Sequence, residues 1–254
     1  MSYSPLMAGT AIITEGSRGI GAATARQAAM AGYDVCINYV THSKTADRVV
    51  AESEALGRKA LAVKADVGNA QDVAELFTAC DNALGPVSLL VNNAGIIGKA
   101  TTGADLPDDA LARTFEVNVY GNVYCAREAI QRMATSKGGS GAIIVNVYSV
   151  AARLGSPGEY VHYAASKAAV ETFTIGLAKK IGGEGIRGNA LQAGTTDTDI
   201  HKSSGNSDRP ALVAPMSPLG RIASADDIAA GILCLASPES SYVTVAVLPI
   251  SGGL

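Results

Sequence analysis

The 254-residue sequence alternates short apolar blocks with longer helical segments from Thr10 onward. The apolar blocks predict strands that are buried on both faces, and the segments between them are rich in helix formers. The predicted strands cover residues 10–14, 34–39, 60–65, 88–92, 141–149, 186–191 and 242–250, and the predicted helices cover residues 19–31, 43–56, 70–84, 108–136, 163–181 and 224–235. Strands that alternate with helices in this way are typical of a parallel sheet. The sequence therefore predicts an α/β fold, a doubly wound, seven-stranded parallel sheet with helices on both faces.

The predicted elements follow one another without a linker or an internal repeat, so we expect a single domain over residues 1–254. Apolar residues make up 48% of the chain and charged residues 17%, a balance that suits a sheet covered on both faces. Residues 1–9 are expected to form a short N-terminal tail. Residues 195–218 carry Asp, Ser, Gly and Pro without clear periodicity, which predicts a long loop over a binding site, here named the substrate loop.

Charge and composition exclude several classes of function. The formal net charge of −3 argues against nucleic acid or an anionic membrane as the main partner. No apolar run approaches the ~18 residues that span a bilayer, and the first residues lack the basic segment of an export signal. The cysteines, Cys36, Cys80, Cys125 and Cys234, are scattered, and no spacing of Cys or His predicts a metal site. We therefore expect a cytoplasmic protein with reduced thiols.

One stretch brings together polar side chains of chemical use. Ser149 follows an apolar block at 143–147, so its hydroxyl is expected at the carboxyl end of a buried strand. Tyr163 and Lys167 are four residues apart in an Ala-rich segment, and a helix places both on one face. The alternative interpretation is a surface pair whose Lys extends into solvent.

A phenol beside an ammonium suits proton transfer. A free Tyr titrates near pH ~10, and a fixed cation next to it favours the phenolate. We therefore expect Lys167 to lower the pKa of Tyr163. Tyr163 would give a proton to a carbonyl oxygen or take one from an alcohol, while Ser149 hydrogen-bonds that oxygen. Such a reaction also requires a source of hydride.

A glycine-rich turn at residues 14–21, Thr-Glu-Gly-Ser-Arg-Gly-Ile-Gly, joins the first predicted strand to the first predicted helix. Backbone N–H groups in such a turn, together with the positive end of the helix, hold phosphate groups. The turn therefore predicts a pyrophosphate site that involves Gly16, Ser17, Arg18, Gly19, Ile20 and Gly21.

Taken together, these motifs resemble the short-chain dehydrogenase/reductase family, in the compact single-domain form that includes 3-oxoacyl-[acyl-carrier-protein] reductases and glucose dehydrogenases. The family pattern is T-G-x-x-x-G-x-G, N-N-A-G, a lone Asn, Ser and Y-x-x-x-K. The chain carries it at 14–21, 92–95, Asn118, Ser149 and 163–167, in the same order and over nearly its whole length. The resemblance implies a Rossmann-type fold and an oxidoreductase that transfers hydride between a nicotinamide cofactor and a carbonyl or secondary-alcohol substrate.

The resemblance also implies roles for single residues. Tyr163 is the expected general acid or base, Lys167 is expected to hold the nicotinamide ribose, and Asn118 is expected to complete a proton relay through water. The further cofactor contacts that it implies are Asp66, Val67, Asn92, Ala94, Gly95, Thr196 and Thr198. Simpler interpretations stay open, with Asp66 as a strand-end cap, Asn92 as a turn residue and Asn118 as a buried helical amide.

The choice of cofactor follows from charge at the end of the second strand. That strand ends Asn-Tyr-Val-Thr-His, without a carboxylate to bind a free ribose 2′-hydroxyl. Arg18 offers a cation for a 2′-phosphate, unless it is only a solvated loop charge. We therefore prefer NADP as the cofactor and keep NAD as the alternative.

Glu15 departs from the family pattern because it stands at the first glycine of the turn. Its bulk and its negative charge near phosphates should lower the affinity for the cofactor, unless the carboxylate turns to a ribose hydroxyl and favours NAD. The alternative function is therefore a non-catalytic or weakly active dinucleotide-binding relative.

The substrate and the assembly follow only from the resemblance, which implies a small carbonyl or alcohol compound and a homotetramer. We expect the substrate loop, with His201, Lys202 and Met216, to frame the substrate pocket together with the stretch 153–162.

Overall fold

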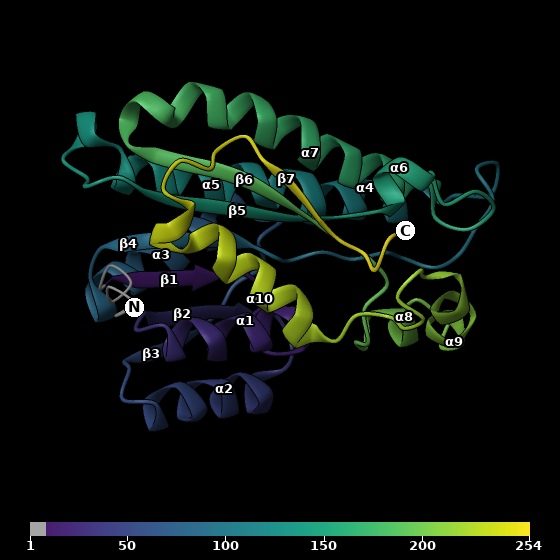
Figure 1. Cartoon of the computed structure of the whole chain (residues 1–254), viewed down its shortest axis with the longest axis horizontal. Coiled ribbons are helices and arrows are strands. Elements are labelled where there is room, and N and C mark those ends of the chain that lie inside the picture. Colours follow the sequence, from purple (N-terminus) through teal and green to yellow (C-terminus); the bar gives the residue numbers. More distant parts are fainter. Residues whose placement is uncertain (1–8) are drawn as a thin grey trace.

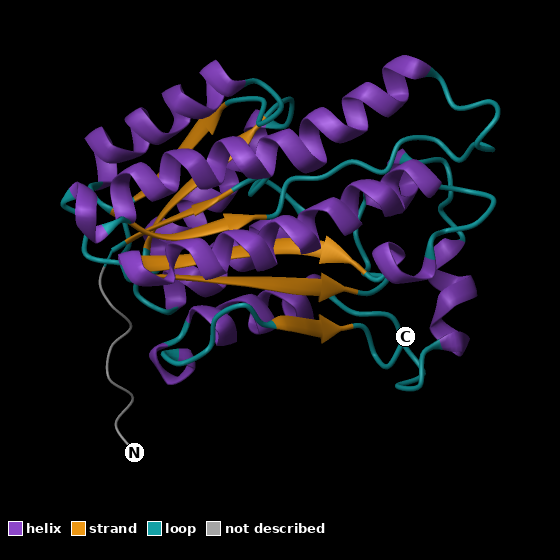
Figure 2. Ribbon diagram, turned by 90° about the horizontal axis from the view of Figure 1, so that it is seen from above, coloured by secondary structure: helices purple, strands orange, loops and turns teal. Residues whose placement is uncertain are grey.

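The computed structural model describes residues 9–254, and residues 1–8 of the expected tail lie outside the described residues. A seven-stranded sheet has the strand order β3-β2-β1-β4-β5-β6-β7, and Figure 2 shows its strands in orange among the purple helices. The strands are β1 (Thr10–Ile13), β2 (Asp34–Tyr39), β3 (Ala60–Lys64), β4 (Val87–Asn92), β5 (Ala142–Ser149), β6 (Ile186–Ala193) and β7 (Val247–Ile250). Each neighbouring pair is parallel, so the strands all end at one edge of the sheet. The predicted parallel sheet is confirmed.

Helices cover both faces of this sheet (Figure 1). One face carries α1 (Gly19–Met30), α2 (Ser43–Ala55) and α10 (Ala225–Ala236), and the other carries α3 (Ala70–Leu84), α5 (Gly121–Met133) and α7 (Val161–Ile181), with α4 (Asp108–Phe115) beside α7. The short helices α6 (Ala151–Leu154), α8 (Ile200–Ser203) and α9 (Arg209–Val213) lie beyond the strand ends, and single 3-10 turns cover Thr135–Lys137, Gly182–Glu184, Ala214–Met216 and Pro238–Ser240. Within residues 9–254, no helix has both the length and the apolar character needed to cross a membrane.

Alternate residues of each strand supply two separate cores. In β1, Ile13 packs with the side chains of α1 and α10, whereas Ile12 packs with those of α3. In β5, Val145 packs in the same core as Ile13 and Ile144 packs in the same core as Ile12, and both are fully buried. Because both faces of the sheet are covered, its strands are continuous apolar blocks instead of alternating apolar and polar residues.

The helix predicted over residues 108–136 is interrupted in its middle. After α4, residues Glu116–Tyr120 form a π-helical turn, and α5 then begins at Gly121. A π turn shifts the following side chains around the helix axis and is common at functional sites. Gly121 also lets the helix approach Val67, because a methyl group there would lie 2.8 Å from Val67 Cγ2. No glycine or proline within residues 116–120 signals this interruption.

Two other elements differ from the prediction. The substrate loop contains α8, α9 and a 3-10 turn, too short to give a helical period. The last strand begins at Val247 and not at residue 242, because Val245 has a φ of 62°. A β-branched residue in the left-handed region breaks the extended backbone, so strand pairing starts only after it.

Candidate active site

The predicted site residues meet at the carboxyl edge of the sheet. The strand order reverses between β1 and β4, and such a switch point opens a crevice beyond the strand ends. A cavity of about 440 Å³ lies there, between the turn after β1, the ends of β5 and β6, α7 and the substrate loop. The predicted residues that line it are Arg18, Gly19, Ile20, Gly95, Ser149, Tyr163, Lys167, Thr196 and Thr198.

Ser149, Tyr163 and Lys167 share this cavity. Ser149 is the last residue of β5, and Tyr163 and Lys167 lie one turn apart in α7. The Lys167 Nζ atom is 5.9 Å from the centre of the Tyr163 ring and donates to the carbonyl of Val147 at 3.1 Å. The Lys167 side chain is buried, so the alternative of a solvent-exposed surface pair is wrong.

Burial dominates the protonation equilibria of this pair. Loss of hydration raises the pKa of Tyr163, while a hydrogen bond with Ser149 and the positive charge of Arg209 oppose that rise. Burial also lowers the pKa of Lys167 to about 8, against the opposite effect of the Glu15 carboxylate. The prediction that Lys167 brings the pKa of Tyr163 below its usual value is therefore wrong. The positive charge of Arg209, which lines the same cavity, lowers this pKa against the effect of burial.

Asn118 lies within the π turn and is fully buried beside the cavity. Its side chain binds the backbone of Ile96 in both directions, accepting from the N–H at 2.8 Å and donating to the carbonyl at 2.9 Å. It also donates to the Ser166 hydroxyl, and its own backbone carbonyl accepts from the Asn122 amide. The side chain therefore joins α7 to the segment after β4, as the buried-amide interpretation anticipates.

The turn after β1 has the geometry of an anion site. Arg18 precedes α1 in an extended conformation and provides no side-chain cap, so the first N–H groups of the helix are left for a ligand. A methyl group on Gly16 would lie 2.3 Å from Ile37 Cγ2, and one on Gly21 would lie 2.3 Å from the Glu15 carbonyl oxygen. Gly16 therefore lets the turn pack closely against β2, and Gly21 lets α1 start close to the turn, but neither glycine lines the cavity, nor does the buried Ser17.

Glu15 lies in this turn with a φ of 51°, a left-handed conformation that glycine adopts without strain. Its N–H donates to Asn38 Oδ1 at 2.9 Å. Its carboxylate accepts from the Arg18 guanidinium at 2.9 Å and from the Gly95 N–H at 3.4 Å. The donors at this end of the cavity thus bind an anion supplied by the chain itself. Donors of this kind fit the phosphates of a dinucleotide, which would have to compete with Glu15 for them.

Asp66 and Val67 lie behind the cavity wall. The Asp66 carboxylate accepts from the Gly68 N–H at 2.9 Å and pairs with Arg113 at 2.6 Å. Val67 is 4% exposed and packs against the π turn. These contacts agree with the interpretation of Asp66 as a strand-end cap.

Asn92 and Ala94 also lie behind the wall. Asn92 donates to Asn146 Oδ1 at 2.9 Å and so joins β4 to β5 in the sheet interior, which shows that it is not a turn residue. The N–H groups of Asn93 and Ala94 both donate to the Thr14 hydroxyl at 2.9 Å. This bond network fixes the end of β4 beside the glycine-rich turn.

The base of the substrate loop faces that turn. Thr196 forms an isolated β-bridge with Ala223, which brings the two ends of the loop together. Thr198 stands over the start of α1, because a methyl group on Gly19 would lie 3.2 Å from Thr198 Cγ2. The bridge between Thr196 and Ala223 therefore holds Thr196, and Thr198 two residues later, beside the start of α1.

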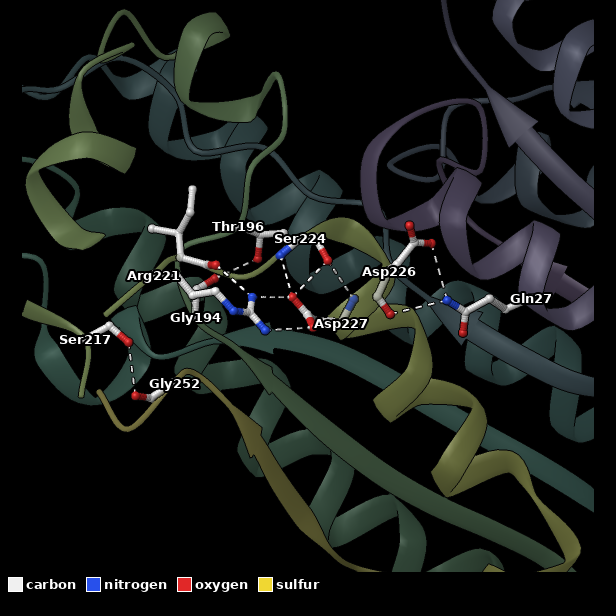
Figure 3. A network of polar contacts seen from close by, with 10 residues as sticks. Gln27, Gly194, Thr196, Ser217, Arg221, Ser224, Asp226, Asp227 and Gly252 are labelled. Atoms are coloured by element: carbon white, nitrogen blue, oxygen red, sulfur yellow. Dashed lines mark hydrogen bonds and ion pairs between the residues drawn. The ribbon is translucent and has the colours of Figure 1, made fainter. Parts of the chain in front are cut away.

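The far end of the loop is fixed by the start of α10 (Figure 3). The Ser224 hydroxyl accepts from the Asp227 N–H, and the Asp227 carboxylate accepts in return from the Ser224 N–H. Arg221 binds the same carboxylate at 2.6 Å, and Ser217 donates to the Gly252 carbonyl. Ser224 therefore caps α10, and this capping box anchors the loop to the helix layer.

The two segments expected to frame the substrate pocket both line the cavity, but the ion pair that joins them escapes prediction. His201 and Met216 line the cavity as expected, whereas Lys202 does not. Glu159 and Arg209 also line it and form an ion pair across it. They are 50 positions apart, and no local spacing relates an Arg in an irregular segment to a Glu in another loop.

Comparison with known proteins agrees with this geometry. A family model described as enoyl-(acyl carrier protein) reductase matches residues 15–254. The uncharacterized oxidoreductase YgfF of Escherichia coli is 43% identical over 243 residues, covering 96% of this chain and 98% of the relative. L-rhamnose 1-dehydrogenase (NAD(P)(+)) of a Sphingomonas species is 38% identical over 247 residues, covering 96% and 95%.

Solved structures superimpose over nearly the whole chain. The short chain dehydrogenase of Burkholderia cenocepacia in complex with NADP has a TM-score of 0.90 at 35% identity, covering 98% of this chain and 99% of that chain. A blue fluorescent protein from a metagenomic library in complex with NADPH has a TM-score of 0.90 at 34% identity with the same coverage. The sheet order, the cavity at the strand ends and these relatives agree: the chain belongs to the short-chain dehydrogenase/reductase family of NAD(P)-dependent oxidoreductases.

Proposed function

We propose that this protein transfers hydride between NADP(H) and a small carbonyl or secondary-alcohol substrate, with Tyr163 as the general acid or base. The observation that carries the proposal is the cavity that Tyr163, Ser149 and Lys167 share with the start of α1. A proton donor, a hydroxyl that can bind the substrate oxygen and an anion site all lie at the carboxyl edge of the sheet, as reduction of a carbonyl requires.

Each side chain has a distinct part in the proposed reaction. When bound, the nicotinamide cofactor supplies or accepts the hydride. Ser149 donates a hydrogen bond to the substrate oxygen, and Tyr163 gives that oxygen a proton during reduction. Lys167, held by the Val147 carbonyl, lies next to Tyr163 and binds the ribose. Asn118 contributes by holding Ile96 against α7, and it is the residue that completes the proposed proton relay through water.

The proposed cofactor contacts follow the glycine-rich turn and the neighbouring strand ends. They comprise Gly16, Ser17, Arg18, Gly19, Ile20, Gly21, Asp66, Val67, Asn92, Ala94, Gly95, Thr196 and Thr198. NADP is preferred because β2 ends without a carboxylate and because Arg18, within the glycine-rich turn, offers a cation for the 2′-phosphate. Two relatives of known structure were solved with NADP or NADPH, which supports the same choice.

The mouth of the cavity guides the choice of test substrates. Leu154, Leu212 and Met216 line it and are each more than half exposed. Carbonyl compounds with apolar substituents therefore belong in a panel beside sugars and acyl thioesters.

We expect the purified protein to oxidise NADPH in the presence of at least one carbonyl compound of such a panel. The specificity constant kcat/KM should be at least about fivefold higher with NADPH than with NADH, because Arg18 can pair with a 2′-phosphate. Absorbance of the reduced nicotinamide, with the carbonyl compound omitted as control, measures the rate. Failure of both cofactors with every carbonyl and alcohol would contradict the proposed reaction.

A weakly active relative is the second candidate, and the carboxylate of Glu15 at the Gly95 N–H favours it. We also propose that the protein is a cytoplasmic homotetramer, as its resemblance to the family implies. Tyr120, at the end of the π turn, and Tyr242, before β7, are exposed aromatic side chains that such an assembly would cover.

A further inference from the structure

The substrate loop contacts the opposite wall of the cavity at its tip as well as at its base. Asn206 Nδ2 donates to Oε1 of Glu159 at 3.1 Å, and Arg209 forms an ion pair with the same carboxylate. The Arg209 guanidinium also lies 5.9 Å from the centre of the Tyr160 ring, where a cation and a ring face attract each other. We name Glu159, Asn206 and Arg209 the latch.

The two sides of the latch are held differently. Glu159 belongs to a fixed wall, because its carbonyl accepts from the Thr101 N–H at 3.0 Å and the following Tyr160 is 2% exposed. Arg209 opens α9, a helix of five residues whose loop is pinned at its base by the Thr196 bridge. The substrate loop is thus fixed at its base, and its tip is held by the polar contacts of Asn206 and Arg209 with Glu159. Loss of these contacts would let the loop open.

We propose that the latch closes the substrate loop over the cavity and thereby holds the Arg209 guanidinium in the same cavity as Tyr163. Arg209 is then a positioning residue for proton transfer, and Glu159 is the residue that sets its place. The proposal rests on the proposed function, because it requires Tyr163 to exchange a proton with the substrate.

Charge in the cavity supports this assignment. The other titratable side chains around the cavity are Glu15 and Arg18 beside α1, Tyr148 in β5, Glu159 and Tyr160 before α7, Lys167 within α7, and Asp199, His201 and Arg209 in the substrate loop. Among these, the Arg209 charge lowers the pKa of Tyr163 against the rise caused by burial. A cation stabilises the phenolate more than the phenol, so its loss moves the pKa upward.

The pH dependence of alcohol oxidation separates this role from a structural one. Oxidation needs the Tyr163 phenolate, so the rate rises with pH through the pKa of Tyr163. In Arg209→Gln we expect this rising limb to move to higher pH by about half a unit. In Arg209→Lys, which keeps the charge, we expect a smaller displacement. Arg48→Gln, which removes an exposed cation of α2, serves as the matched control and should leave the limb in place.

The latch itself is tested without turnover. Lys202 is exposed in the substrate loop, and trypsin cleaves a flexible loop faster than a closed one. In Glu159→Gln we expect cleavage of the full chain after Lys202 to be about fivefold faster than in the parent, because the ion pair is lost. The Arg48→Gln control should be cleaved at the parental rate.

The outcomes are distinguishable. If the parent enzyme turns over and the oxidation rate of Arg209→Gln rises at the same pH as that of the parent, the positioning role of Arg209 is overturned. The proposed function is then left intact. Unchanged cleavage in Glu159→Gln overturns the latch. A parent protein without any turnover overturns the proposed function and the positioning role together, whereas the cleavage rates still decide the latch.

Discussion

Replacement of Tyr163 by Phe is expected to lower kcat by about a thousandfold while leaving the Kd for NADPH within about twofold of the parental value. The substitution removes the phenolic proton and keeps the ring that packs in the cavity beside Lys167. Steady-state rates with the best carbonyl substrate, together with a fluorescence titration with NADPH, measure the two effects separately. Loss of turnover without loss of binding identifies a group that acts in the chemical step.

Tyr242→Phe is the matched control for this experiment. Tyr242 does not line the cavity, and Phe keeps the ring that the proposed assembly would cover, so removal of the hydroxyl should change neither turnover nor binding. A Tyr163→Phe protein that turns over at the parental rate would show that another group donates the proton. Ser149 is then the next hydroxyl in the cavity to test.

Replacement of Glu15 by Gly is expected to tighten NADPH binding by about tenfold, or ~1.4 kcal/mol. The carboxylate accepts from the Gly95 N–H and holds Arg18 in an ion pair, so cofactor phosphates would have to compete with it for these donors. Gly also adopts the left-handed backbone of this position without strain. Binding of NADH should improve less, because only NADPH carries the 2′-phosphate that the freed Arg18 can bind.

Two variants separate the causes of this change. Glu15→Gln keeps the size of the side chain and removes its charge, so it should recover part of the gain if repulsion is the main cost. In the Glu15→Gly background, Arg18→Gln should remove the preference for NADPH. Weaker NADH binding by Glu15→Gly would instead indicate that the carboxylate meets a ribose hydroxyl, as the alternative cofactor hypothesis holds.

The parts of this molecule that are predictable from its sequence are those that depend on residues close together in the chain. The strands around Ile13 and Val145 are continuous apolar blocks because both faces of the sheet are covered. Tyr163 and Lys167 share a face because four residues make about one helical turn. Ser224 caps α10 through a bond to a residue three positions away. Each of these features is set by neighbours in the sequence.

Features that depend on distant contacts escape such prediction. The direction of the pKa shift of Tyr163 depends on burial and on Arg209, which follows it by many residues and reaches it only through the substrate loop. The π turn at Asn118 is held by bonds to Ile96 and Ser166, in two other elements. The sequence alone also leaves open the position of the Glu15 carboxylate, because its partner Gly95 follows a different strand.

Binding of NADPH to the unmodified protein tests the central claim most directly, because the claim requires a dinucleotide to displace the Glu15 carboxylate from Arg18 and the Gly95 N–H. We predict saturable binding in a fluorescence titration without substrate, with a Kd between about 1 μM and 1 mM. NADP should compete for the same site. Absence of binding by both NADPH and NADH at millimolar concentration would contradict the claim.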